Sequence, residues 1–491
     1  MSDTAERKRE LGFSERMSEH EALMWNVEKD PWLNPSGAAL VVFDKPIDVE
    51  EFRRRMRHAV SELPRLYQRV SPGFGRISTP AWAPDPEFEL DFHFRTTTLP
   101  PPGTERQLFD LGARLYQEPF DRTRPLWRLV VIDGLESGEG ALWMITHHAV
   151  SDGIGQLRMA EMYQDLSPDV PPAPEVDLEG IIAEAVAEHR LKEEGGDLAT
   201  SLRSTVTRSA SHLVRRQVGI ARRVAGELVL WPADPKRIGD RAADITAAAR
   251  GTIGPLAKSA TESDTGSPLW RQRSRHRHLE HVRIPLDSLK AAAKRHDASV
   301  NDAFMAGMVE AAARYHAERG VSVDTFNTSF VLSTRSDSAA GGNAFTPVQV
   351  QLSGREMPLD ERLVDVRDRI ARARDDAARG GGITALSGVV NLFPTSMVTR
   401  LARSQAGRID FATSNLRGAS FPLYVAGARV LRTITMGPLA GTPCNATALS
   451  YENAFDIGLF IDPEAIEDPA DFRRCVETAF GDLLDDTPGS G

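Results

Sequence analysis

The sequence predicts an α/β (α+β) protein built of two halves, and three observations support this. Stretches with helical spacing of apolar residues and short β-branched runs occur at similar density early and late in the chain. Residues 167–178 contain four prolines, which is typical of a linker. A chain of 491 residues with 41% hydrophobic residues is long enough for two domain-sized units. We therefore expect an N-terminal half (1–168), a linker and amphipathic helical region (169–265), and a C-terminal half (266–491).

The elements of the N-terminal half follow from short-range apolar spacing. Val49, Phe52 and Met56 recur every three or four positions, which predicts an amphipathic helix. Strands are predicted where apolar, often β-branched residues run continuously, as before the turn signal Asp133-Gly134. On this basis we expect strands at 39–43, 128–132 and 141–146, and helices at 48–62, 105–118 and 155–165.

The C-terminal half shows the same mixture of patterns. Its strongest helical signal places Phe304, Met308 and Ala312 on one stripe. Residues 179–265, between the halves, carry many charges and give no clear strand. In the C-terminal half we expect strands at 282–285, 326–332, 446–451 and 455–461, and helices at 286–295, 301–318, 360–378 and 469–485.

The composition argues against several classes of protein. A formal net charge of −10 leaves no excess of cations to neutralise phosphates, so we expect no nucleic-acid partner. The two cysteines, Cys444 and Cys475, form no CxxC pair, and we expect two reduced thiols. Residues 1–12 lack an apolar signal segment, and no run of about 18 apolar residues occurs. We therefore expect a cytoplasmic protein with at most peripheral membrane contact.

The most informative motif is Thr146-His147-His148-Ala149-Val150-Ser151-Asp152-Gly153, which ends a predicted strand. Because side chains alternate across a strand, the two histidines cannot face the same side. One can reach a solvent channel while the other holds the loop, and Asp152-Gly153 provides a turn before the next helix. Adjacent residues that point apart also suit one metal ion badly, so we expect no metal.

A histidine in this position is suited to activate an alcohol. An alcohol is essentially never ionised at neutral pH, whereas histidine, with an ordinary pKa of about 6.5, is largely neutral and accepts a proton. Such general-base assistance is worth about 10²–10⁴ in rate. The chain contains no GxSxG nucleophile elbow. We therefore predict direct attack of a hydroxyl oxygen on a thioester carbonyl, without an acyl-enzyme.

The sequence resembles the bacterial wax ester synthase/diacylglycerol acyltransferase (WS/DGAT) family, within the CoA-dependent acyltransferases that share the HHxxxDG motif. Nearly the whole chain takes part in the resemblance, which is weakest at 179–265. It implies two chloramphenicol-acetyltransferase-like halves with a substrate tunnel at their interface. Four further family-like signatures occur in the expected order: Leu99-Pro-Pro-Pro-Gly103, Asp121-Arg-Thr-Arg-Pro-Leu-Trp127, Ser299-Val-Asn-Asp302 and Ser414-Asn-Leu-Arg-Gly418.

The resemblance also implies roles for single residues. His148 is the expected general base, and His147 and Asp152 complete the catalytic motif. Asp152 is expected to hold the loop through a salt bridge, without acting on substrate. Gly153 is expected to leave room for the thioester and pantetheine arm of the donor. Four residues are expected to pack around the substrates or bind them: Pro125, Leu126, Trp127 and Asn415.

Three residues outside the motif are expected to shape the site. Asn301 and Asp302 begin a predicted helix, where asparagine is a good N-cap and aspartate suits the helix dipole. The resemblance gives the same pair a role in shaping the site, and the two interpretations are compatible. Arg335 follows a predicted strand and is our candidate partner for Asp152. A solvated loop arginine explains Arg335 at least as well.

The sequence departs from the family pattern where substrate choice is expected to be made. Met17-Ser-Glu-His-Glu21 stands where the family has an aspartate after Leu-Ser-Pro-Leu. Ile145 occupies a position that is often lysine, and Arg417 replaces the usual proline before Gly418. We expect the reaction type to be retained, whereas the acceptor and the acyl chain length stay open.

Two basic segments have alternative interpretations. Residues 198–226 contain several arginines and no acidic residue. They predict an amphipathic helix that either rests on an anionic membrane or lipid-droplet surface or packs on the body of the protein. Residues 271–281 contain three histidines, for which we favour a basic strand edge, able to meet CoA phosphates, over a metal site.

The predicted function is that of an O-acyltransferase. It would move a fatty acyl group from acyl-CoA, a substrate and no cofactor, to a long-chain alcohol or to diacylglycerol. One alternative is a condensation-type or polyketide-associated enzyme that uses a carrier-bound thioester, and activity with free acyl-CoA discriminates between the two. A second alternative is a non-catalytic acyl-lipid-binding relative, against which the presence of His148 argues.

Overall fold

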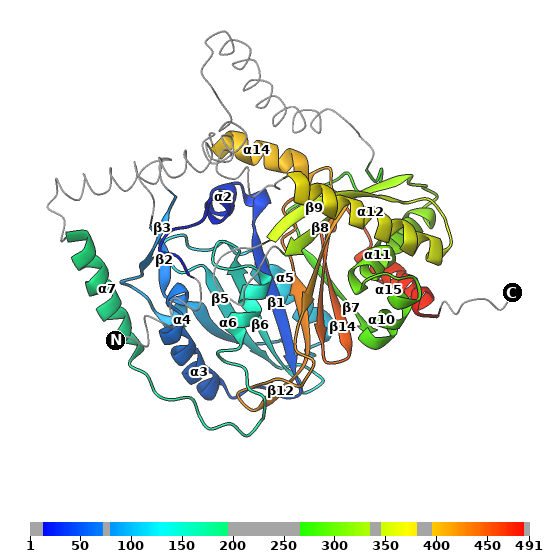
Figure 1. The fold of residues 1–491 in the computed structure, drawn as a ribbon. Coiled ribbons are helices and arrows are strands. Elements are labelled where there is room, and N and C mark those ends of the chain that lie inside the picture. The colour runs from blue at the N-terminus through cyan, green and yellow to red at the C-terminus, as the bar shows by residue number, and fades with distance from the viewer. Residues whose placement is uncertain (1–12, 72–78, 195–265, 334–344, 381–394, 486–491) are drawn as a thin grey trace, which may run out of the picture.

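The computed structural model describes residues 13–71, 79–194, 266–333, 345–380 and 395–485 (Figure 1). It contains two six-stranded sheets and one two-stranded sheet, with helices packed around them. The predicted α/β architecture of two halves is thereby confirmed. The basic segment 198–226 and Arg335 lie outside the described residues, so the predictions made for them stay predictions.

The first large sheet has the strand order β11-β12-β1-β6-β5-β4. In this sheet β4 and β5 are parallel, and all other neighbours are antiparallel. The central strands β1 and β6 are buried on both faces, which explains why each is a nearly continuous apolar run. The strands are β1 (Ser36–Phe43), β4 (Phe94–Thr98), β5 (Trp127–Asp133), β6 (Gly140–His147), β11 (Tyr424–Val425) and β12 (Ala428–Met436).

The second large sheet has the order β7-β14-β13-β10-β8-β9. Here β10 runs parallel to both of its neighbours, β13 and β8. The strands are β7 (His278–Pro285), β8 (Thr325–Ser333), β9 (Phe345–Ser353), β10 (Phe411–Arg417), β13 (Cys444–Tyr451) and β14 (Ala454–Ile461). Four helices cover one side of this sheet (Figure 1): α10 (Leu286–Arg295), α11 (Val300–Ala317), α12 (Leu359–Gly380) and α15 (Pro469–Asp485).

Four helices of the N-terminal half, α2, α3, α5 and α6, begin at a side-chain cap. Ser18 and Thr104 each form a capping box, and Asp48 accepts hydrogen bonds from the backbone of the first turn that follows it. The helices are α2 (Glu19–Val27), α3 (Val49–Glu62), α4 (Leu90–His93), α5 (Glu105–Gln117), α6 (Gly153–Ala160) and α7 (Leu178–Glu194). Two short 3₁₀ helices, η1 (Pro31–Leu33) and η2 (Pro64–Leu66), and the hairpin of β2 (Gln68–Ser71) and β3 (Ala81–Pro84) complete this half.

Strand β12 connects the two large sheets. β12 comes from the C-terminal part of the sequence but pairs with β1 in the first sheet. Thr435 of β12 donates a hydrogen bond from Oγ1 to the carbonyl oxygen of Thr447 in β13 (3.0 Å). On the same junction the ring of Tyr116 from α5 packs edge-on against Phe460 of β14, with centroids 4.6 Å apart. The predicted domain boundaries stay a prediction, and the first sheet draws strands from both ranges.

The predicted helices and strands within the described residues are confirmed, and several further elements were not predicted. The two predicted helices at 48–62 and 105–118 match α3 and α5 within one residue. α6 ends earlier than the predicted 155–165. The elements that were not predicted are α2, α4, α14 (Thr395–Ala406), β2, β3, β4, β9, β10, β11 and β12. Among them, β9 does alternate apolar and polar residues from Val348 to Leu352, as a half-buried strand does. No helix within the described ranges is long and apolar enough to cross a membrane.

Candidate active site

The histidine pair lies where β6 leaves the first sheet. In the pairing of β1 with β6, Ser36 lies opposite His147 and Gly37 opposite Thr146. The His147 amide donates to the carbonyl oxygen of Leu126 (3.0 Å), and the Val150 amide donates to the His147 carbonyl oxygen (2.9 Å). These bonds fold residues 147–150 into a tight turn, so strand, turn and α6 follow one another without a loose connection.

The first histidine holds the turn. His147 is fully buried, and its Nδ1 accepts a hydrogen bond from the Ala149 amide (2.9 Å). Since Nδ1 is an acceptor, the neutral ring carries its proton on Nε2, which lies 3.5 Å from Oε2 of Glu28. The rings of Trp25 and Phe120 pack edge-on around it. His147 is therefore committed to the fold of the motif, as one of the two histidines was expected to be.

Glu28 and Arg122 continue this chain of contacts away from the turn. The Arg122 guanidinium pairs with the Glu28 carboxylate, donates to the Trp25 carbonyl oxygen (2.8 Å), and lies over the Trp25 ring. Burial alone would raise the pKa of Glu28, but its interactions with His147 and Arg122 outweigh burial and lower the pKa. A charged Glu28 thus fixes the tautomer of His147. Sequence reasoning missed Glu28, whereas Arg122 lies inside the quoted Asp121–Trp127 signature.

The second histidine is the one available for chemistry. His148 is only partly buried, whereas His147 has no exposed surface. A methyl group built on Gly37 would lie 3.2 Å from Nε2 of His148, so the glycine lets the imidazole pack closely against β1. Burial and the neighbouring His147 lower the pKa of His148 to about 4, although Asp152 partly offsets the shift. The imidazole is therefore neutral at physiological pH and accepts a proton.

Asp152 acts on the loop through backbone capping. Its carboxylate is 4% exposed and accepts a hydrogen bond from the Gly155 amide (2.8 Å), which makes Asp152 the N-cap of α6. Its charge also reaches α2: burial lowers the pKa of His20, and Asp152 partly offsets that shift. Asp152 therefore anchors the start of α6, and the role expected for it stays a prediction. The proposed salt bridge to Arg335 involves a residue outside the described ranges and stays a prediction.

Gly153 marks the point where the two halves meet at the motif. A methyl group on Gly153 would lie 3.1 Å from Cδ2 of Leu416, which belongs to β10 of the second sheet. Asn415, next to Leu416 on the same strand, is exposed. The structure therefore brings the Ser414–Gly418 signature against the start of α6, although the two lie more than 250 residues apart in the sequence.

Pro125, Leu126 and Trp127 are all buried behind the histidine turn. The Trp127 indole donates to the Leu66 carbonyl oxygen (2.7 Å) and stacks on His93 with ring centroids 4.6 Å apart. Leu126 and Trp127 share one apolar cluster with Ala149 and Val150 of the turn. The three residues thus pack behind the histidine turn. Their contact with an acyl chain stays a prediction.

The Asn301–Asp302 pair has a local role in α11, and one detail of the prediction was wrong. The N-cap of α11 is Ser299, not Asn301, because the Asp302 amide donates to Oγ of Ser299 (3.2 Å). The Asp302 carboxylate completes the capping box by accepting from the Ser299 amide (2.8 Å) and hydroxyl (2.6 Å). Ser299 is the N-cap because its short hydroxyl side chain reaches the backbone amide of Asp302, three positions later. The role of the pair in the site stays a prediction.

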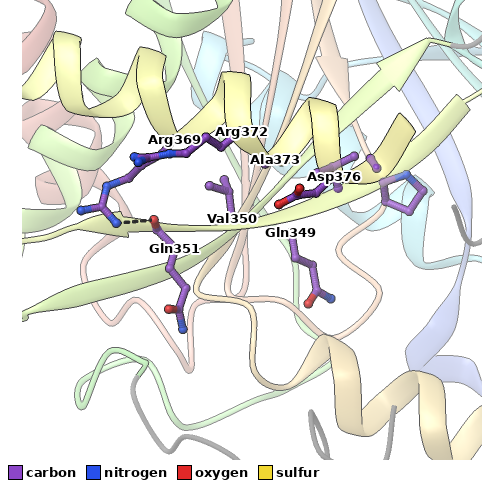
Figure 2. Close-up of a pocket in the computed structure, with 10 residues that line it drawn as sticks. Gln349, Val350, Gln351, Arg369, Arg372, Ala373 and Asp376 are labelled. Atoms are coloured by element: carbon purple, nitrogen blue, oxygen red, sulfur yellow. Dashed lines mark hydrogen bonds between the residues drawn. The ribbon is translucent and has the colours of Figure 1, made fainter. Parts of the chain in front are cut away.

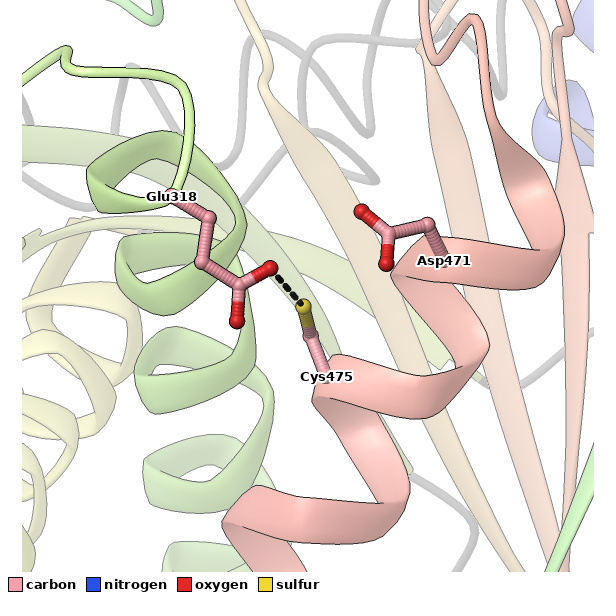
Figure 3. A group of neighbouring side chains, drawn as sticks. All are labelled: Glu318, Asp471 and Cys475. Atoms are coloured by element: carbon pink, nitrogen blue, oxygen red, sulfur yellow. Dashed lines mark hydrogen bonds between the residues drawn. The ribbon is translucent and has the colours of Figure 1, made fainter.

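Outside this site, Glu318, Asp471 and Cys475 form a compact group between α11 and α15 (Figure 3). Arg474 contacts both carboxylates, at 2.5 Å from Glu318 and 2.6 Å from Asp471, and Arg319 lies 2.8 Å from Asp471. Burial raises the pKa of the Cys475 thiol to about 12, with the Glu318 charge adding to the shift. A metal ion there would face two guanidinium groups and a protonated thiol, so we assign the group to helix packing.

Two of the three histidines in residues 271–281 contact carboxylates of the protein. His278 and Arg106 both contact the Glu280 carboxylate, at 2.6 and 2.8 Å. His281 lies 2.7 Å from the buried carboxylate of Asp456. The basic strand edge expected here is thus balanced by carboxylates, and the contact with CoA phosphates stays a prediction.

A hollow of about 700 Å³ lies between β9 and α12 (Figure 2), away from the histidine pair. Its lining includes Gln349, Gln351, Arg372 and Asp376, and Arg369 donates to the Gln351 carbonyl oxygen (3.3 Å). The predicted tunnel between the halves is a different place. No contact in this hollow tests the tunnel, which stays a prediction.

Two mixed sheets, with a histidine turn of the HHxxxDG type at the end of a central strand, define an acyltransferase of the two-lobed chloramphenicol-acetyltransferase class. The chain belongs to the wax ester synthase/diacylglycerol acyltransferase family. Its sequence matches the WS/DGAT catalytic domain over residues 17–304 and the WS/DGAT C-terminal domain over residues 341–484. This confirms the family that the motifs indicated and establishes that the protein is an acyltransferase.

Individual relatives agree with this assignment. A Mycobacterium tuberculosis protein named as a diacylglycerol O-acyltransferase is 30% identical over 97% of this chain and 94% of its own length. Among solved structures, the wax ester synthase/diacylglycerol acyltransferase from Marinobacter aquaeolei VT8 matches with a TM-score of 0.62, 19% identity, and coverage of 95% and 98% of the two chains. A condensation domain of the calcium-dependent antibiotic synthetase matches with a TM-score of 0.56, 14% identity, and coverage of 97% and 98%. The structural matches show the fold shared by both kinds of protein.

Proposed function

We propose that this acyltransferase moves a fatty acyl group from acyl-CoA to the hydroxyl group of a long-chain alcohol or of diacylglycerol, with His148 as the general base. One observation carries the proposal: a half-buried His148 with a lowered pKa lies directly after a central strand, with its Nε2 beside Gly37 of β1. A neutral imidazole nitrogen in that position accepts the hydroxyl proton.

The reaction balances without a covalent enzyme intermediate. The hydroxyl oxygen attacks the thioester carbonyl carbon while its proton passes to Nε2 of His148. The tetrahedral intermediate collapses when the carbon–sulfur bond breaks, and the sulfur of the leaving thiol takes the proton back. His147, held between the Ala149 amide and Glu28, keeps the turn in place while the proton moves. Gly153 lies where the two halves meet, which is where a donor arm is expected to enter.

The partners follow from the same proposal. Acyl-CoA and a lipid alcohol are substrates, and the proposed chemistry uses no metal or cofactor. Contact with an anionic membrane or lipid-droplet surface, which would deliver apolar acceptors, is proposed through residues 198–226 and lies outside the described part of the chain.

The test is release of free thiol from palmitoyl-CoA by the purified protein, with and without 1-hexadecanol or dipalmitoylglycerol. We expect release that depends on the acceptor and a matching yield of ester by chromatography, because no acyl-enzyme accumulates. The same assay with a palmitoyl-pantetheine-loaded carrier protein is the comparison arm. Turnover with the carrier-bound donor alone would replace this proposal by a condensation-type reaction, to which the shared fold also corresponds.

The pH dependence gives an independent check on the base. Since the pKa of His148 is lowered to about 4, the neutral form prevails over a wider acid range than for a free histidine. We expect kcat/KM to stay level from about pH 8 to about pH 5 and to fall below that, as the proton occupies the free enzyme's base. Far-UV circular dichroism at each pH distinguishes protonation of His148 from acid unfolding as the cause of the fall in kcat/KM. An acid limb centred near the ordinary histidine pKa of about 6.5 would contradict the buried environment of His148.

A further inference from the structure

A cluster of positive charge directly before β7 has no carboxylate partner in the described part of the chain. In residues 271–277, arginine stands at every second position, although the whole chain has a formal net charge of −10. The arginines of residues 53–57 in α3 are as dense, but each of those pairs with a carboxylate. Like charges this close repel one another, which favours the binding of an anion. The members of this arginine cluster are Arg271, Arg273, Arg275 and Arg277.

The free donors of the arginine cluster are on Arg271, Arg275 and Arg277. Arg277 is half-buried, and its Nη1 donates to two backbone carbonyl oxygens of the segment itself (2.7 and 3.2 Å). Its Nε and Nη2 have no acceptor within the described residues, and the exposed Arg271 and Arg275 donate no hydrogen bond there. Asp462, an acidic group whose charge acts on Arg277, already accepts from the Ser274 amide and hydroxyl (2.5 Å each). The segment therefore carries free N–H donors and an excess of positive charge.

The arginine cluster lies toward the end of the sheets where the histidine turn is found. The Tyr116 hydroxyl donates to the Ser36 carbonyl oxygen (2.7 Å), and Ser36 lies opposite His147 in the first sheet. The charge of Arg277 acts on the same hydroxyl, since burial raises the pKa of Tyr116 and Arg277 partly offsets this shift. Arg273 donates from Nε to a carbonyl oxygen of the turn between β12 and β13 (3.0 Å), which leaves the first sheet at this end. An anion bound by the cluster would therefore lie on the side of the protein where β6 ends.

We propose that the arginine cluster binds the phosphate groups of the CoA donor, with Arg271, Arg275 and Arg277 donating to phosphate oxygens and Arg273 holding the segment in place. The inference rests on the proposed function and gives the nucleotide end of the donor a place in the protein. A guanidinium group is planar and always charged, and it can donate to two oxygens of one phosphate at once. The phosphates of CoA are separated from the thioester by the pantetheine arm, so their subsite can lie apart from His148.

The experiment compares palmitoyl-CoA with S-palmitoyl-pantetheine, a donor that has the same thioester but carries no phosphate. In the double variant Arg271→Gln/Arg275→Gln we expect the KM for palmitoyl-CoA to rise at least about tenfold, the scale of one charge-assisted hydrogen bond. The KM for S-palmitoyl-pantetheine and both kcat values should stay within about twofold, because the reacting atoms are unchanged. Arg277→Gln should show the same pattern.

Isothermal titration with adenosine 3′,5′-bisphosphate, which carries the 3′-phosphate of CoA, measures the subsite without turnover. We expect both arginine variants to bind it at least about tenfold more weakly than the wild type. The matched control is Arg190→Gln/Lys294→Gln, which removes two exposed cations from α7 and α10 and should leave both KM values and the binding unchanged. Circular dichroism and the thermal unfolding midpoint verify the fold of every variant.

The two donors and a lipid arm decide the outcome. Folded arginine variants that keep the wild-type KM for palmitoyl-CoA, or that raise the KM for both donors alike, would overturn the inference. Anionic lipid headgroups offer the same phosphate chemistry, so the variants are also sedimented with vesicles of phosphatidylglycerol and phosphatidylcholine. Loss of vesicle binding with an unchanged KM would assign the cluster to a membrane instead. If the wild type transfers no acyl group, the proposed function fails, while the titration still tests the phosphate subsite.

Discussion

Replacement of His148 by alanine is expected to lower kcat/KM for acyl transfer by a factor of about 10² to 10⁴, while the protein remains folded. His148 is half-buried directly after β6, and its Nε2 lies beside Gly37 of β1. Its removal takes away the group that receives the hydroxyl proton. The fold is expected to survive, because the hydrogen bonds that form the turn come from His147 and from the backbone.

The measurement is acceptor-dependent thiol release at saturating palmitoyl-CoA, with the thermal unfolding midpoint recorded for each variant. The matched control is His276→Ala, which removes an exposed histidine of the C-terminal half and should leave both quantities unchanged. A His148→Ala protein that folds and keeps more than about a tenth of the activity would remove His148 as the base. Loss of activity together with a large drop in the midpoint would assign His148 to the fold instead.

A large loss of stability is expected from Gly458→Ala, at the junction of the two sheets. A methyl group there would lie 2.0 Å from the carbonyl oxygen of Thr435 in β12 and 3.0 Å from the carbonyl carbon. Backbone atoms cannot rotate away as a flexible side chain can, so β12 or β14 must move. Overpacking in a rigid core costs about 1–3 kcal/mol and occasionally more, and we expect a loss of about 3 kcal/mol or more of unfolding free energy here.

Urea unfolding followed by circular dichroism measures this loss, and Gly481→Ala is the control. Gly481 lies in α15 with no atom within 4 Å of its added methyl group, so alanine should be neutral or should stabilise the helix by up to about 1 kcal/mol. A Gly458→Ala variant that unfolds within about 0.5 kcal/mol of the wild type would show that β12 is not packed against β14.

Much of the architecture was open to prediction from local patterns. Strands such as β6 and β14 are continuous apolar runs, and helices such as α3 and α5 repeat their apolar residues every three or four positions. Both signals depend only on neighbouring residues, so one sequence suffices to find them. β10 and β12 were not predicted from the sequence. Their burial depends on strands and loops from distant parts of the chain.

The candidate site also has a part that local sequence predicts and a part that it does not. By itself, the sequence determined the contiguous part: two histidines, Asp152 and Gly153, placed by strand end, turn and helix start within eight residues. It also determined the family, because the signatures follow one another along the chain. In both cases the information is carried by residues that are close in sequence.

Only the tertiary structure decided which histidine holds the turn and what surrounds the other. Glu28, the C-cap of α2, lies beside Nε2 of His147, Gly37 from β1 packs against His148, and Leu416 from β10 packs against Gly153. These contacts arise because β1 pairs with β6 and because β12 links the two sheets. Pairing between strands depends on long-range packing, which no short stretch of sequence specifies, and so the surroundings of the base emerge only when the chain has folded.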